Sequence, residues 1–210
     1  MNIFIFSILA MTYFAVVTKR TTTLISIFAA QSLFLALMTA YEAYTGGDKE
    51  LYVVAALLFL VKALMIPFFL RRISEKIKTG NNMGMLINPL VSLFFAVGLT
   101  YMAYLFADKI MYIQDKMQAG SLAISLSVTL IGLFLMIFRL KAITQVIGLL
   151  IMENGIFLAA VSLCGNMPFL VEITIFFDVL VCVIIFEIFI YKINSLFTHI
   201  DVDKLSELKG

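Results

Sequence analysis

The chain has 210 residues, of which 63% are hydrophobic and only 13% are charged, and its mean hydropathy is +1.09. These values exclude a soluble globular domain of this length and indicate a polytopic membrane protein. The net charge of +2 is spread over the connections between apolar runs. The sequence therefore offers no basic run of the kind that binds nucleic acid.

Seven apolar runs approach the ~20 residues that a helix needs to cross the hydrocarbon layer. In chain order they cover residues 2–17, 22–44, 51–70, 86–107, 121–138, 142–163 and 169–191. The first run is short, because a helix of about 16 residues reaches only about 24 Å. We predict an all-α fold in which residues 1–210 form one transmembrane domain of about seven helices.

The connections between these runs differ in charge on the two sides of the predicted bundle. One side holds only Lys49, Lys109 and Lys116, and each of these has an acidic neighbour. By the positive-inside rule, this asymmetry predicts that the N-terminus lies outside and the C-terminus lies in the cytoplasm. The basic residues on the predicted cytoplasmic side are Lys19, Arg20, Arg71, Arg72, Lys76, Lys78, Arg139, Lys141, Lys192, Lys204 and Lys209.

Three ionisable residues lie near the centres of apolar runs: Lys62, Glu153 and Asp178. A charge at the centre of a bilayer costs roughly 2.5–3.5 kcal/mol on insertion scales, and such a residue usually marks a proton or ion path. We therefore predict that these three side chains transfer protons or ions. The polar residues that we expect to support them are Gln31, Gln145, Asn154 and Thr174.

Each of the three candidates also has a structural interpretation. Glu153 as a protonated acid would hydrogen-bond to a neighbouring helix. Asp178 and Lys62 would form an inert ion pair. Lys62 also precedes Pro67, whose missing amide hydrogen frees the carbonyl of Ala63 and favours a kink in the helix.

The sequence has no pattern for redox, hydrolytic or metal chemistry. Its two cysteines, Cys164 and Cys182, stand in no metal-binding or redox motif, and its one histidine, His199, follows the last apolar run. We therefore expect no catalytic residue, metal ligand or cofactor-binding site in this chain.

A weak internal repeat relates the two halves of the chain. A shift of 122 residues lays the start of the second apolar run on the start of the sixth, so that Gln31 meets Glu153. After a longer outer loop in the first copy, Lys62 takes the place of Asp178. We predict two parallel three-helix units joined by a linking span. The first unit covers residues 11–78, the linking span and its loops 79–120, the second unit 121–193, and a cytoplasmic tail 194–210.

Three segments carry a family resemblance. Gln145–Gly155, which reads QVIGLLIMENG, Leu170–Asp178, and the tail Ile200–Gly210 together resemble hydrogenase-4 component E, and the likeness spans nearly the whole chain. The last three apolar runs also resemble the small K subunit of bacterial complex I and the C subunit of Mrp-type antiporters.

The wider family implies a role for two membrane-embedded glutamates on neighbouring helices, which serve proton transfer there. The first of these aligns with Leu150, one helical turn before Glu153, and the second aligns within about one residue of Asp178. A shift of one turn keeps the group on nearly the same face of the helix but moves it about 4.5 Å along the axis.

The resemblance implies a membrane subunit of a complex-I-like assembly, such as a group 4 NiFe hydrogenase or a formate hydrogenlyase-type complex, in a prokaryotic cytoplasmic (inner) membrane. Its partners would be antiporter-like membrane subunits and lipid, and the NiFe centre and iron–sulfur clusters would lie in other subunits. An alternative is an assembly subunit that seals the interface between larger membrane subunits, with its buried charges paired and inert. A free-standing small-solute transporter is disfavoured because no discontinuous helix is evident from the sequence.

Overall fold

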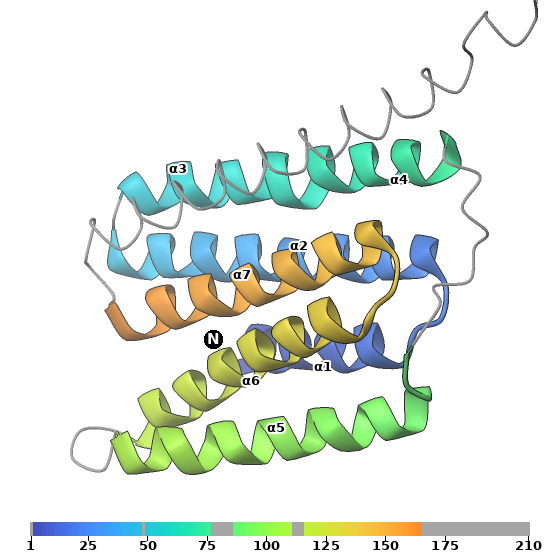
Figure 1. Cartoon of the computed structure of the whole chain (residues 1–210). Coiled ribbons are helices and arrows are strands. Elements are labelled where there is room, and N and C mark those ends of the chain that lie inside the picture. Colours follow the sequence, from blue (N-terminus) through green and yellow to red (C-terminus); the bar gives the residue numbers. More distant parts are fainter. Residues whose placement is uncertain (1, 48, 77–85, 111–115, 165–210) are drawn as a thin grey trace, which may run out of the picture.

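The computed structural model describes residues 2–47, 49–76, 86–110 and 116–164 (Figure 1). These residues form helices and no strand, so the predicted all-α class is confirmed. In chain order the helices are α1 (Asn2–Val17), α2 (Thr21–Gly46), α3 (Lys49–Leu57), the π-helix η1 (Leu58–Met65), α4 (Ile66–Lys76), α5 (Pro89–Ile110), α6 (Lys116–Phe138) and α7 (Ala142–Cys164).

Five helices of the described part are long and apolar enough to cross a membrane, and α3, η1 and α4 together make one of them. The helix α1 is apolar but shorter, in agreement with the length of the first apolar run. The chain is therefore a multi-pass membrane protein. The seventh predicted span, residues 169–191, and the predicted tail, residues 194–210, lie outside the described residues.

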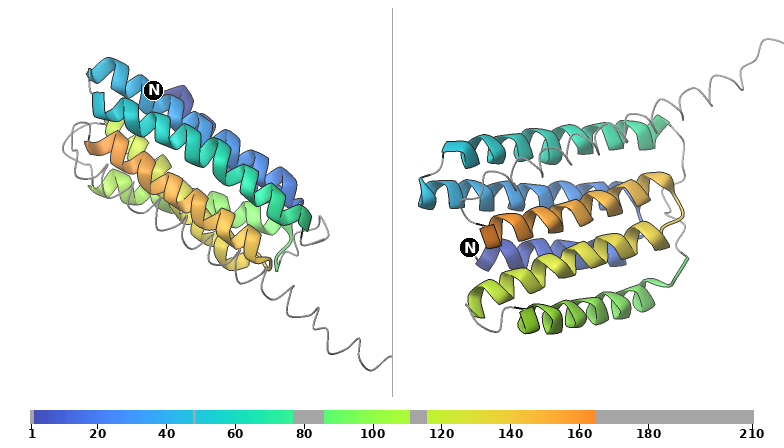
Figure 2. Two further views of the ribbon diagram at one scale, coloured as in Figure 1. Left: turned by 90° about the horizontal axis from the view of Figure 1, so that it is seen from above. Right: turned by 60° about the vertical axis from the view of Figure 1, so that its left-hand side comes forward.

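Successive helices run in alternating directions and lie side by side (Figures 1 and 2). The continuous helix of α3, η1 and α4 lies along one edge of the bundle, and α5 lies along the opposite edge. Between them, α1, α2, α6 and α7 supply most of the buried apolar side chains, including Ile8, Phe28, Leu35, Ile147 and Leu150. By contrast, α5 exposes many large apolar side chains, as expected for a helix that faces lipid.

Glycines allow α6 and α7 to pack closely. A Cβ atom added at Gly155 would lie 2.6 Å from the backbone nitrogen of Thr129, and one at Gly148 would lie 2.6 Å from that of Met136. Gly148 and Gly155 are seven residues apart, so they share one face of α7. Small residues let membrane helices approach each other in this way. Asn154, about 100° around α7 from Gly155, is left to make polar contacts with α2.

A buried arginine joins the two halves of the chain at one end. Arg139 follows α6, and its Nη2 donates to the carbonyls of Ala15, Val16 and Thr18 at 2.9, 3.1 and 3.1 Å. The last carbonyls of a helix have no partner within the helix, and a cation there also interacts favourably with the helix dipole. Burial lowers the pKa of Arg139 to about 10, so its guanidinium is charged at neutral pH.

This contact also fixes the relative direction of the helices. Because Arg139 follows the end of α6 and binds the end of α1, these two helices run in the same direction. The next helices, α2 and α7, start from the same end of the bundle and also run parallel to each other. The N–H of Leu86 donates to the carbonyl of Phe138 at 3.3 Å, and Arg71 donates to Ser26 at 2.9 Å. The basic residues of these connections therefore gather at one end of the bundle, while the division into two three-helix units stays a prediction.

Candidate functional site

Lys62 lies within a π-helical segment in the middle of a membrane span. The helix that starts at Lys49 changes its hydrogen-bond pattern over η1, where the N–H of Ile66 donates to the carbonyl of Val61, five residues earlier. The π-helical segment ends just before Pro67, the residue from which the sequence predicted a kink. The kink itself stays a prediction. Short π-helical segments inside α-helices are frequently found at functional sites.

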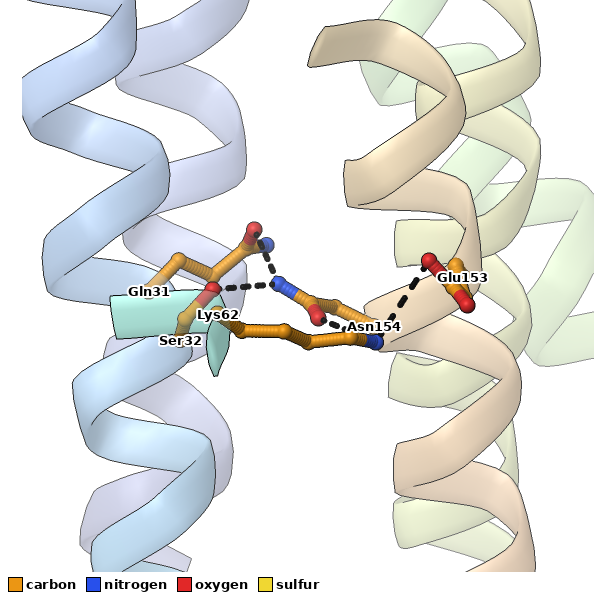
Figure 3. A network of polar contacts seen from close by, with 5 residues as sticks. All are labelled: Gln31, Ser32, Lys62, Glu153 and Asn154. Atoms are coloured by element: carbon orange, nitrogen blue, oxygen red, sulfur yellow. Dashed lines mark hydrogen bonds and ion pairs between the residues drawn. The ribbon is translucent and has the colours of Figure 1, made fainter. Parts of the chain in front are cut away.

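The ammonium of Lys62 faces a carboxylate from α7. Lys62 Nζ lies 3.5 Å from Glu153 Oε2 (Figure 3). Lys62 is 1% exposed and Glu153 is 4% exposed. Removing two charges from water is costly, and their mutual attraction offsets that cost only when they lie close together. The two residues that sequence reasoning placed near the centres of separate spans therefore form one buried ion pair.

A carboxamide next to this pair connects it to α2. Lys62 Nζ donates to Asn154 Oδ1 at 3.4 Å. Asn154 Nδ2 in turn donates to Gln31 Oε1 at 3.2 Å and to Ser32 Oγ at 3.1 Å. Figure 3 shows these side chains converging from η1, α2 and α7.

The hydrogen bonds continue from α2 to α1. Gln31 Nε2 donates to Thr12 Oγ1 at 2.8 Å, and the Thr12 hydroxyl donates to the carbonyl of Ile8 at 2.8 Å. We refer to Lys62, Asn154, Gln31 and Thr12 as the polar chain; each of its members is 1% exposed or less. Buried polar groups are costly unless they are hydrogen-bonded, and each member of the polar chain has a partner.

The sequence around Glu153 explains its position on α7. Leu150 and Phe157 lie one turn before and one turn after Glu153, and both are buried on nearly the same face. Asn154 points about 100° away from Glu153, toward α2, because a helix turns once in 3.6 residues. Two adjacent residues of α7 thus make different contacts. Glu153 pairs with Lys62, and Asn154 connects Lys62 to α2.

The structure brings together four of the predicted site residues: Lys62, Glu153, Asn154 and Gln31. It places Gln145 elsewhere, at the start of α7, where Nε2 donates to the carbonyl of Arg139 at 2.8 Å. The other two predicted residues, Asp178 and Thr174, lie outside the described residues. The role of these side chains in ion transfer stays a prediction.

Sequence reasoning missed several polar contacts. Thr12 and Ser32 belong to the hydrogen-bonded cluster, and both are single hydroxyls within apolar runs. A further pair, Tyr13 and Thr100, joins α1 to α5 with 2.6 Å between their oxygens. Two features of the sequence could have indicated these residues. Thr12 is an isolated polar residue in the first apolar run, and Ser32 is adjacent to the predicted site residue Gln31.

The charged groups of the cluster are one ammonium and one carboxylate. Within the described ranges, no three His, Cys, Asp or Glu side chains are placed so that they could hold a metal ion. An ammonium opposite the carboxylate also disfavours a bound divalent metal ion at the same place. What the pair offers is two opposite charges held close together in a setting of low dielectric constant.

Comparison with known proteins identifies distant homologues of the chain. The chain is 27% identical to hydrogenase-4 component E of Escherichia coli K12 over 186 residues, which cover 87% of this chain and 85% of that protein. The chain is a distant homologue of hydrogenase-4 component E. The same identity and coverage hold for hydrogenase-4 component E of Shigella flexneri.

An uncharacterized protein of Mycobacterium tuberculosis is 28% identical over 187 residues, or 89% of this chain and 85% of that protein. No protein-family model and no solved structure matches the chain. The resemblance to hydrogenase-4 component E that the sequence predicted is thereby confirmed. The further likeness to the K subunit of complex I and to the C subunit of Mrp-type antiporters stays a prediction.

Proposed function

We propose that this homologue of hydrogenase-4 component E is an integral membrane subunit of a complex-I-like assembly, namely a group 4 NiFe hydrogenase or formate hydrogenlyase-type complex. The homology and the apolar helices fit a membrane subunit of a hydrogenase complex. Its partners are antiporter-like membrane subunits, and the NiFe centre and iron–sulfur clusters belong to other subunits. The basic end of the bundle faces the cytoplasm, so the N-terminus lies outside, in a prokaryotic cytoplasmic membrane.

Within that assembly, Lys62 and Glu153 take part in proton or sodium transfer, together with Asp178. The observation that carries this proposal is the buried ion pair, with 3.5 Å between Lys62 Nζ and Glu153 Oε2. When a proton reaches Glu153, the carboxylate becomes neutral and no longer balances the charge of the ammonium. The free energy of that imbalance is large where water is scarce, so protonation of one group biases the state of the next group along the path.

The test is Glu153→Gln in the complete complex. The amide keeps the shape of the side chain but has no titratable proton. We expect the complex to assemble and to retain electron transfer, while coupled ion translocation into membrane vesicles is lost. The matched control is Glu42→Gln, which makes the same change in α2 outside the polar cluster. Normal translocation by an assembled Glu153→Gln complex would refute the proposal.

A second function is an assembly subunit whose charges are inert. The observation in its favour is that the charges of Lys62 and Glu153 balance and that the ammonium is also hydrogen-bonded to Asn154. An inert ion pair can often be replaced by apolar residues of similar volume without loss. The double variant Lys62→Met with Glu153→Leu separates the two functions, because an assembly subunit would support normal translocation without the pair, whereas an ion-transfer subunit would not.

A further inference from the structure

The carboxamide of Asn154 has one orientation that satisfies its neighbours. Its Nδ2 lies 3.2 Å from Gln31 Oε1 and 3.1 Å from Ser32 Oγ, and its Oδ1 lies 3.4 Å from Lys62 Nζ. A rotated carboxamide would turn its NH₂ group toward the ammonium and its oxygen toward the oxygen of Gln31. The contacts on both sides therefore fix the direction in which Asn154 donates.

The far end of the polar chain sets the same direction. Thr12 accepts from Gln31 Nε2 at 2.8 Å and donates to the carbonyl of Ile8 at 2.8 Å. A backbone carbonyl only accepts hydrogen bonds, so the Thr12 hydroxyl has to point toward it while its oxygen faces Gln31. Every donor from Lys62 to Thr12 thus points toward α1.

This order determines where the ammonium of Lys62 lies. The lysine stem is flexible, and its ammonium acts as a point charge that can turn its three donors in many directions. Here the ammonium lies between two adjacent residues of α7, 3.4 Å from Asn154 and 3.5 Å from Glu153. The Asn154 contact thus fixes one donor of the ammonium, and its loss would shift the ammonium relative to Glu153 although Glu153 itself was unchanged.

We propose that Asn154, Gln31 and Thr12 are positioning residues that hold the Lys62 ammonium opposite Glu153, so that an ion passing Glu153 always meets the same counter-charge. This inference rests on the proposed function in ion transfer. Carboxamides do not titrate in the range in which carboxylates do, so Asn154 and Gln31 orient the charge and do not carry the proton themselves. Among the described residues, Lys62 is the charged group that faces Glu153, and the rest of the polar chain is neutral.

The test breaks the polar chain far from the ion pair. Thr12→Val has nearly the same shape but no hydroxyl, while Thr12→Ser keeps the hydroxyl. The matched control is Thr39→Val. Thr39 is also fully buried, and its hydroxyl also donates to the carbonyl four residues earlier, that of Leu35, at 2.9 Å. None of the hydrogen bonds between described residues joins Thr39 to the polar chain.

The measurement is the pH dependence of coupled ion translocation by the complete complex in vesicles. An ammonium that is no longer held near a carboxylate stabilises its charged form less. Thr12→Val should therefore raise the pH of half-maximal translocation by about 0.5 unit or more. Thr12→Ser and Thr39→Val should keep the wild-type value, and Asn154→Leu should give a larger rise than Thr12→Val.

The possible results separate this inference from the proposed function. If Glu153→Gln leaves translocation intact, the proposed function itself is refuted. If Glu153→Gln abolishes translocation while Thr12→Val and Asn154→Leu keep the wild-type pH dependence, only the positioning role is refuted. An equal rise in Thr39→Val would also overturn it. If the Thr12→Val complex does not assemble, Gln31→Met replaces it as the test, because it removes the member of the polar chain that α2 contributes. A wild-type pH dependence of translocation in Gln31→Met would overturn the inference.

Discussion

The buried ion pair allows a quantitative prediction about stability. Two unit charges 3.5 Å apart interact by about 5 kcal/mol at the effective dielectric constant of about 20 that suits protein sites. Removing one partner of a buried pair leaves an uncompensated charge and typically costs about 3–5 kcal/mol. We therefore expect Lys62→Met alone to lower the free energy of unfolding by about 3–5 kcal/mol at neutral pH.

The double variant Lys62→Met with Glu153→Leu should behave differently. It removes both charges and fills the space with apolar atoms, a change that is often neutral or stabilising by about 1–4 kcal/mol. The loss seen in the single variant should therefore be recovered. The coupling energy from the cycle of wild type, two single variants and double variant should reach about 3 kcal/mol or more.

The assay is unfolding of the chain within the purified complex in mixed micelles, followed for all four proteins of the cycle at neutral pH. Additive effects, with a coupling energy below about 0.5 kcal/mol, would show that the two charges do not stabilise each other. That result would contradict the geometry of the pair and, with it, the reasoning from that geometry to ion transfer.

Two further predictions concern the packing of the helices. Gly155→Ala should lower the free energy of unfolding by about 1–3 kcal/mol, because the new Cβ would meet the backbone of α6. In the control Gly98→Ala, the new Cβ meets nothing within 4 Å, so this variant should be neutral or slightly stabilising. Equal losses in both variants would show that the close approach of α6 and α7 is unimportant. Arg139→Met should lower the free energy of unfolding by about 2–4 kcal/mol in the same assay, since three carbonyls near the end of α1 lose their donor. Arg139→Lys should recover only part of this loss, because a single ammonium does not match the guanidinium geometry. Burial lowers the pKa of Arg139 to about 10, so the folded and unfolded states both keep the proton below about pH 9. The cost should therefore be flat from about pH 6 to pH 9, and a steep slope there would contradict this assignment.

The sequence predicted the spans and the charged centre of the site for the same physical reason. An apolar run of about 20 residues has few alternatives to a membrane helix, and an ionisable residue at its centre is too costly to be there without a partner or a role. This argument identifies Lys62 and Glu153 from their positions alone. It does not say which partner each one has, and the structure pairs Lys62 with Glu153.

The missed contacts depend on how helices are packed, which a single sequence does not encode locally. Arg139 was counted as a basic residue of a connection, where it would ordinarily be exposed, yet it is 2% exposed and binds α1 across more than 120 residues of sequence. Thr12 already has a satisfied hydroxyl within its own helix, so nothing near it in the sequence indicates that Gln31 also reaches it. The π-helix around Lys62 was missed because Pro67 signals only that the α-helical hydrogen-bond ladder is disturbed.

The predicted internal repeat gives the polar cluster a simple interpretation. The shift of 122 residues relates Ser32 to Asn154 and Gln31 to Glu153. Asn154 bonds to its own equivalent, Ser32, at 3.1 Å, which is the kind of contact expected at an axis between two parallel units. The two units differ in charge at this point, because the first presents a neutral carboxamide where the second presents a carboxylate. If the predicted repeat holds, this difference explains why Lys62 faces a carboxylate, Glu153, from the second unit, while the first unit contributes the neutral Gln31 to the polar chain.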